Sequence, residues 1–190
     1  MTQKIPSNIG SIYSIAAAGD ASYYVSVGTD RKLRVIDLRA ANCSLVLNAD
    51  NYSEMNYVSL NNSALHLRAQ FKSQIASMYL KQTVPIKPAE KLAAVAHCDG
   101  AVTLWDITAG KLADQIFQHS SECRSVEFSC DNKWIASASF DYSIGILNNE
   151  TKAFTSVKKH TDRVVSVKWH PYLPILLSTS ADRTARILTI

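Results

Sequence analysis

The chain has 190 residues, of which 47% are hydrophobic and 19% are charged, and its formal net charge is +4. This length suffices for one domain with a substantial core, and the near-zero mean hydropathy is typical of a soluble globular protein. No apolar run is long enough to span a membrane, and the first residues, MTQKIPSNIG, lack the apolar core of a secretory signal. We therefore expect a cytoplasmic or nuclear protein.

The four cysteines favour buried free thiols over disulfides or a metal site. They lack CxxC spacing, and three lie in or beside strand patterns. The run His97-Cys98-Asp99 has no zinc-ligand spacing, and strand alternation would send its neighbouring side chains to opposite faces. The six glycines occur singly, so no phosphate-binding loop is present. We expect neither metal nor cofactor.

The first fifty residues predict four short strands. The apolar runs lie at 12–17, 23–29, 33–38 and 44–48. Asp30 lies in the tight turn between the second and third runs. No histidine precedes this unit at the spacing found later in the chain, so we expect Asp30 to lack the partner that the later turn aspartates have.

The spacing of the turn aspartates then becomes irregular. The separation from Asp99 to Asp141 nearly equals that from Asp141 to Asp182, whereas the separation from Asp30 to Asp99 is far longer. The excess is about 27 residues, longer than an ordinary loop between strands. We assign it to an insertion at about 51–70 and to the loop QTVPIKPAE.

The second unit is predicted at 71–118. Its first strand would use Ile75, Met78 and Leu80, and its later strands fall at 92–97, 102–107 and 112–117. Asp99-Gly100 is a strong hairpin signal between the second and third strands.

The last seventy residues contain one pattern twice. The copies are HSSECRSVEFSCDNKWIASASFDYSIGIL and HTDRVVSVKWHPYLPILLSTSADRTARIL, and each begins with a histidine, His119 or His160. In each copy an aspartate, Asp141 or Asp182, follows the histidine at the same spacing. With the run 154–158, each period holds four short antiparallel strands. A period of about 41 residues with four strands indicates a repeat architecture.

This pattern resembles the WD-repeat β-propeller family, whose blades combine such a histidine, a serine or threonine, a turn aspartate and a tryptophan-aspartate pair. The pair is present as Trp105-Asp106. The resemblance implies an all-β fold of four-stranded antiparallel blades in a single domain, 1–190. About four blades are expected, at 8–50, 71–118, 119–159 and 160–190. Because family propellers usually have more blades, we expect an incomplete propeller, or one that a partner completes.

The resemblance also implies a buried hydrogen-bond network inside each blade. Its members would be His119, Ser137, Asp141, His160, Ser178, Asp182, Asp99 and Trp105. With leucine in the tryptophan position at Leu147 and Leu188, the networks of the last two blades should be shorter. A His–Asp–Ser set also occurs in nucleophilic enzymes. Its repetition in adjacent blades indicates scaffolding instead, so we predict no catalytic residue and no enzymatic activity.

Partner binding is expected on the rim of the blades. The family's contact positions correspond to Glu122, Arg124, Phe140, Arg163, Val165 and Tyr13, and in the second blade to Gln74, Ala76 and Cys98. Phe140 flanked by Arg124 and Arg163 is either an anchor for a peptide or a locally packed side chain.

The last forty residues form a basic end. From 151 to 190 there are seven basic and two acidic residues, and the predicted patch is Lys158, Lys159, Arg163, Lys168, Arg183 and Arg186. We predict a non-catalytic scaffold in a multi-subunit assembly, whose propeller is completed or capped by protein partners or by a second copy. The alternatives are an RNA-associated subunit that uses the basic end and a reader of modified peptides at the rim.

Overall fold

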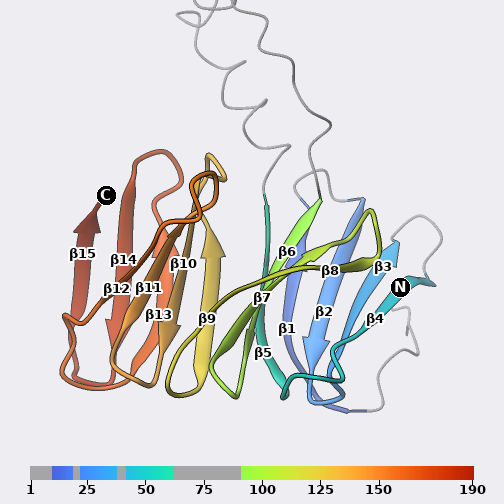
Figure 1. Ribbon diagram of the computed structural model, residues 1–190, viewed down its shortest axis with the longest axis horizontal. Coiled ribbons are helices and arrows are strands. Elements are labelled where there is room, and N and C mark those ends of the chain that lie inside the picture. Colours follow the sequence, from blue (N-terminus) through green and yellow to red (C-terminus); the bar gives the residue numbers. More distant parts are fainter. Residues whose placement is uncertain (1–9, 19–21, 38–41, 62–90) are drawn as a thin grey trace, which may run out of the picture.

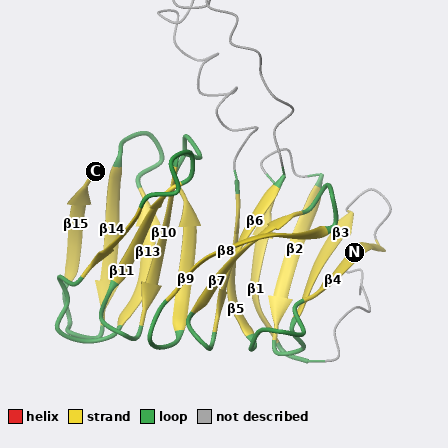
Figure 2. Ribbon diagram, viewed as in Figure 1, coloured by secondary structure: helices red, strands yellow, loops and turns green. Residues whose placement is uncertain are grey.

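The computed structural model describes residues 10–18, 22–37, 42–61 and 91–190. These residues form strands and loops and contain no helix (Figure 2). The fifteen strands make four antiparallel sheets, in agreement with the expected all-β propeller fold. The sheets stand in a row, with the first sheet at one side of the row and the fourth at the other (Figure 1).

The sheets follow the chain in order, and in each the first strand lies at one edge of the sheet, where it contacts the first strand of the neighbouring sheet. The first sheet is β1 (Ile12–Ala17), β2 (Tyr23–Gly28), β3 (Lys32–Asp37) and β4 (Asn42–Asn48). The second is β5 (Met55–Leu60), β6 (Leu92–His97), β7 (Ala101–Asp106) and β8 (Lys111–Gln118). The third is β9 (Cys123–Phe128), β10 (Trp134–Ser139), β11 (Ile144–Asn148) and β12 (Phe154–Val157). The fourth has three strands, β13 (Val164–Trp169), β14 (Ile175–Ser180) and β15 (Ala185–Thr189).

Three apolar clusters hold neighbouring sheets together. They lie between the first and second, second and third, and third and fourth sheets. Strand β6 shows why a strand packed between two sheets carries apolar residues on both faces. Its Ala93 and Val95 pack towards the first sheet, while Leu92, Ala94 and Ala96 pack towards the third. A strand buried on both faces is a continuous apolar run, and LAAVAH is such a run.

The same turn joins the second and third strands of every sheet. Its aspartate is followed by a residue with left-handed backbone: Arg31, Gly100, Tyr142 or Arg183. In each turn the aspartate Oδ1 accepts a hydrogen bond from the N–H two residues later, at 2.9 to 3.3 Å. An aspartate suits this position because its short side chain can accept the N–H two residues later, in addition to the backbone hydrogen bonds of the turn.

The second blade corrects the sequence-based boundaries. Its first strand is β5, within the segment predicted as an insertion at 51–70, and Ile75, Met78 and Leu80 lie outside the described residues. The connection from β5 to β6 takes residues 61–91, whereas the matching connection in the third sheet takes only 129–133. The prediction placed most of the extra residues before the first strand and only the loop QTVPIKPAE after it, whereas the long connection lies entirely after β5.

A second correction concerns Asp30, which has a partner after all. Arg34 Nη2 lies 2.7 Å from Asp30 Oδ2, and the Arg34 side chain is almost completely buried. Arg34 pairs across the sheet with Ser26, as Gly145 pairs with Ser137 and Arg186 with Ser178. The guanidinium thus replaces the missing histidine from within the same sheet.

We predict that Arg34→Ala lowers the free energy of unfolding by about 3 kcal/mol, because it leaves the Asp30 carboxylate without its buried partner. Urea unfolding followed by circular dichroism measures this change. Arg186→Ala, at the equivalent but exposed position of the fourth sheet, is the matched control and should stay within about 0.5 kcal/mol of the unmodified chain. Equal losses in both variants would contradict the assignment.

Candidate functional site

The edge of the sheets that carries the aspartate turns also carries the predicted contact residues. In each sheet a backbone N–H after the second strand donates to a carbonyl before the first strand: Thr29 to Ser11, Cys98 to Glu54, Phe140 to Glu122 and Ala181 to Arg163. These bonds define equivalent positions, which we call the rim positions. They are Ser11, Tyr13 and Thr29; Glu54, Asn56 and Cys98; Glu122, Arg124 and Phe140; and Arg163, Val165 and Ala181.

The rim positions of the second sheet therefore differ from those predicted. Glu54 and Asn56 occupy the places assigned to Gln74 and Ala76, which lie outside the described residues. A signal for the correct alignment was present in the sequence. The segment Tyr57-Val58-Ser59-Leu60 matches Ser125-Val126-Glu127-Phe128 in its valine followed two residues later by a large apolar residue.

The third and fourth sheets each contain the His–Asp–Ser network. His119 Nδ1 lies 3.1 Å from Asp141 Oδ2, and its Nε2 lies 2.7 Å from Ser137 Oγ. The matching distances for His160 are 2.8 Å to Asp182 Oδ2 and 2.8 Å to Ser178 Oγ. In both sheets the same Oδ2 oxygen also accepts the N–H of the residue after the histidine, at 3.1 Å. The aspartate thereby ties its own turn to the loop that enters the first strand.

The protonation states in the third sheet follow from the surroundings. Burial lowers the pKa of His119 more than Asp141 raises it, so the ring is neutral at pH 7. Burial raises the pKa of Asp141, but hydrogen bonds from the Ser143 hydroxyl and N–H, and then His119, outweigh it and bring the pKa to about 2. An ionised carboxylate only accepts, so Nδ1–H donates to Asp141 and Nε2 accepts from the Ser137 hydroxyl.

Burial separates these networks from a catalytic triad. Ser137 and Ser178 are fully buried, and His119 and His160 are only 6% and 5% exposed. A nucleophilic hydroxyl must meet its substrate, and these hydroxyls meet only the interior of their own sheet. The arrangement can hold a loop against a hairpin, and it offers no surface to a reactant.

The second sheet builds its network from other residues. Trp105 Nε1 donates to Thr103 Oγ1 at 2.9 Å, and Thr103 Oγ1 lies 2.8 Å from Nε2 of the buried His97. Asp99 Oδ2 accepts the N–H of Ser53, where the later sheets have the residue after the histidine. With leucine at 147 and 188, the networks of the third and fourth sheets have no indole donor and end at their serines.

Phe140 lies between two arginines on the rim. The guanidinium carbons of Arg124 and Arg163 are 5.6 and 5.2 Å from the centre of its ring. Arg124 Nη1 also donates to Glu122 at 2.9 Å, and Arg163 Nε lies 3.7 Å from Asp162. The ring is half-buried, so Phe140 both packs locally and keeps part of its surface available.

A hollow of about 500 Å³ opens beside this stack and spans the rims of the first three sheets. We call it the rim hollow. It is lined by Tyr13, Glu54, Asn56, Tyr57, Cys98, Glu122 and Arg124. Of the predicted contact residues, Tyr13, Glu122 and Arg124 line the hollow, Phe140 and Arg163 form the adjoining stack, and the half-exposed Val165 lies on β13 in the fourth sheet.

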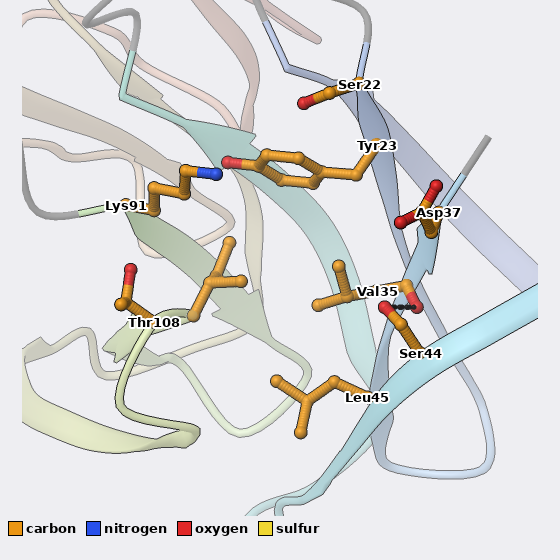
Figure 3. A pocket seen from close by; sticks show the side chains of 9 residues that line it. Ser22, Tyr23, Val35, Asp37, Ser44, Leu45, Lys91 and Thr108 are labelled. Carbon is orange, nitrogen blue, oxygen red and sulfur yellow. Dashed lines mark hydrogen bonds between the residues drawn. The ribbon is translucent and has the colours of Figure 1, made fainter. Parts of the chain in front are cut away.

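A second hollow, of about 540 Å³, lies between the first and second sheets at the edge opposite the aspartate turns. Figure 3 shows Lys91 pointing towards Tyr23, with its Nζ 4.9 Å from the ring centre. Ser44 donates to the Val35 carbonyl at 3.2 Å on the far wall of this hollow.

Two residues of the predicted basic patch, Lys168 and Arg163, contact other side chains. Lys168 Nζ lies 2.9 Å from Glu127 Oε2 and donates to the Tyr57 hydroxyl at 3.2 Å, and Arg163 stacks on Phe140. Burial lowers the pKa of Lys168, but the Glu127 hydrogen bond and charge outweigh it and raise the pKa. All six residues of the predicted patch are exposed, the other four being Lys158, Lys159, Arg183 and Arg186.

The cysteines of the chain are free thiols, Cys43, Cys98, Cys123 and Cys130. No three histidine, cysteine or acidic side chains of the described residues converge on a point where they could hold a metal ion. Within the described ranges there is also no helix with the length and apolarity needed to cross a bilayer.

Comparison with known protein families gives two matches. The family model for the WD40 repeat (WD domain, G-beta repeat) matches residues 110–146 and 151–188. Each match begins at the outer strand of one sheet, β8 or β12, and ends in the third strand of the next. The sequence repeat therefore joins neighbouring sheets, and the matched segments contain both His–Asp–Ser networks.

We predict that the free energy of unfolding falls as the pH drops from 7 to 5. The pKa of an unfolded histidine is about 6.5, and burial lowers the pKa of His97 and His119. Below pH 6.5 the unfolded chain therefore binds protons that the folded chain does not, which favours unfolding. His119→Gln should reduce this pH slope, whereas His170→Gln, which removes an exposed imidazole, should retain it. Urea unfolding at pH 7, 6 and 5 measures the slope, and an unchanged slope in His119→Gln would contradict the prediction.

Proposed function

Because the chain belongs to the WD-repeat family, we propose that it is a non-catalytic scaffold that binds other proteins within a multi-subunit assembly. WD repeats form protein-interaction domains, and the buried His–Asp–Ser networks described above have a structural role. The four free thiols support a cytoplasmic or nuclear location, where thiols stay reduced.

The observation that carries this proposal is the exposure, at both ends of the row, of positions that are buried in the inner sheets. Leu177 and Ile187, on the outer face of the fourth sheet, are 42% and 72% exposed. The equivalent residues of the third sheet, Ala136 and Ile146, are buried against the fourth. The outer face of the fourth sheet thus has the apolar residues of a face that packs against another sheet.

The first sheet shows the same feature on its opposite face. Ile15 is 58% exposed, whereas the equivalent residues Val58 and Val126 are fully buried against the preceding sheet. Val46, which is half exposed, lies on the same face. It ends the row of residues paired across the four strands, which runs from Ile15 through Ser26 and Arg34 to Val46. Ser26 and Arg34, which lie between them in this row, are buried, so the exposed apolar residues are Ile15 and Val46 at its two ends. Large exposed apolar side chains at an end of the array favour a protein-interaction site there.

The outer edge of β15 adds a third contact surface. In the other three sheets the third strand pairs with a fourth, as β11 pairs with β12, but β15 has no outer partner among the described residues. A strand of another protein can bind such an edge through backbone hydrogen bonds. These features support an array that is completed by protein partners.

We predict that the purified chain does not persist as a monomer of 20.9 kDa. Light scattering during size exclusion should give at least twice this mass, because the end faces associate. Ile187→Lys and Ile15→Lys should each weaken association about 10-fold to 100-fold, because each removes the free energy gained by burying one isoleucine side chain. Leu112→Lys, an exposed position on β8 of the second sheet, is the matched control and should leave the mass unchanged. A stable folded monomer would contradict completion through the end faces.

A further inference from the structure

The rim hollow has a preorganised floor. Asn56 is 7% exposed, and its Nδ2 donates to Glu122 Oε1 and to the Cys123 carbonyl, both at 2.9 Å. Its Oδ1 accepts from the Cys98 thiol at 3.2 Å. The floor therefore links the second and third sheets, and it holds the Glu122 carboxylate in one orientation before any ligand arrives.

Two carboxylates face this hollow with acceptor capacity to spare. Glu122 accepts Asn56, Arg124 and the more distant Cys98 thiol, all on Oε1. Among the described residues, no donor contacts Glu122 Oε2 or the side-chain carboxylate of the exposed Glu54. Since Arg124 is the only cationic residue in the lining, the formal charge of the hollow is negative.

The thiol on the floor responds to this negative potential. Burial raises the pKa of Cys98, and the Glu122 and Glu54 carboxylates raise it further. Arg124 acts in the opposite direction and has the smallest influence of the five contributions. The charges of both glutamates therefore raise the pKa of Cys98, and Arg124 offsets them only in part.

An aromatic wall completes the lining. Tyr13, from β1 of the first sheet, is half exposed and lines the hollow. Arg124 lines it from the third sheet. Aromatic rings attract cations that also contact carboxylates. The adjoining stack of Phe140 with Arg124 and Arg163 extends the surface towards the fourth sheet, so residues from all four sheets contribute to it.

We propose that the rim hollow binds the side chain of a lysine or arginine in an extended segment of a partner protein. The Glu54 and Glu122 carboxylates contact the cationic group, and Tyr13 contacts its aliphatic stem. This inference rests on the proposed scaffold function and assigns a recognition site to it. It differs from the end faces, which bind through apolar surface.

The test begins with selection of a phage library of random dodecapeptides on the purified full chain. The expected peptides share a lysine or an arginine. The strongest peptide is then labelled with fluorescein and titrated by anisotropy, with its basic residue intact or changed to glutamine. Each form is measured against the unmodified chain, Glu54→Gln and Glu122→Gln, a change that retains the Oε1 acceptor for Asn56.

Changing the basic residue should weaken binding to the unmodified chain at least fivefold, and should have little effect on binding to Glu54→Gln or Glu122→Gln. A coupling of about this size is what a charge pair produces in a double-mutant cycle. Glu150→Gln, an exposed glutamate in the turn after β11, is the control and should behave as the unmodified chain. Selection of no peptide, selected peptides without a basic residue, or equal losses in all chains would overturn the proposal.

The two proposals fail separately. Glu54→Gln and Glu122→Gln should leave the mass in solution unchanged, since neither residue lies on an end face. Association through the end faces together with no coupling in the peptide cycle would overturn only the rim hollow. A stable monomer whose peptide binding shows the expected coupling would overturn only the end faces.

Discussion

The turn aspartate is the group on which the rest of this structure depends. One of its carboxylate oxygens accepts the N–H two residues later and closes the turn between the second and third strands. The other oxygen accepts a donor from elsewhere in the sheet: His119, His160, the N–H of Ser53, or Arg34. Because a carboxylate has two acceptors at a fixed separation, the turn and the segment it contacts are held in one relative position.

Different groups can serve as the second partner of the turn aspartate. This explains why the first two sheets lack the histidine–aspartate spacing of the last two. Arg34 reaches Asp30 from the third strand of its own sheet, so the first sheet needs no histidine before β1. The second sheet moves its histidine to His97 on β6 and retains the tryptophan that the later sheets have lost. Each sheet therefore gives its turn aspartate a partner of its own, and the partner differs from sheet to sheet.

The same turns place the rim positions, and so they connect stability with recognition. Cys98 and Phe140 each immediately precede the turn aspartate of their sheet, and their backbone N–H groups bond to the carbonyls of Glu54 and Glu122. The backbone is thereby constant from sheet to sheet while the side chains vary. The rim positions of the second and third sheets carry acidic side chains, and the stack of Phe140 with two arginines lies beside them. The end faces carry apolar side chains instead.

Much of the strand pattern could be predicted from the sequence. The strands of the third and fourth sheets follow from the alternation of apolar and polar residues and from the repeated spacing of histidine and aspartate, which are local properties of the chain. The first strand of the second sheet could not be found by counting, because the extra residues lie between β5 and β6 and a count from Asp99 cannot tell on which side of β5 they occur.

What only the tertiary structure decided is which residues from distant parts of the chain meet. The sequence by itself determined the fold class, the turn aspartates and the identity of the repeat, since each depends on residues close together in the chain. It did not reveal that Arg34 replaces a histidine, nor that Glu54, Asn56 and Tyr13 share a hollow with Glu122. The Arg34–Asp30 pair joins residues four positions apart in one sheet, and the backbone of the turn and third strand decides that they meet. The hollow depends on the packing of successive sheets, where Asn56 and Cys123, 67 positions apart, come within hydrogen-bonding distance. The sequence likewise did not show that Leu177 and Ile187 are exposed while the equivalent residues of the third sheet are buried. Burial depends on whether a neighbouring sheet covers the strand, and not on the strand itself.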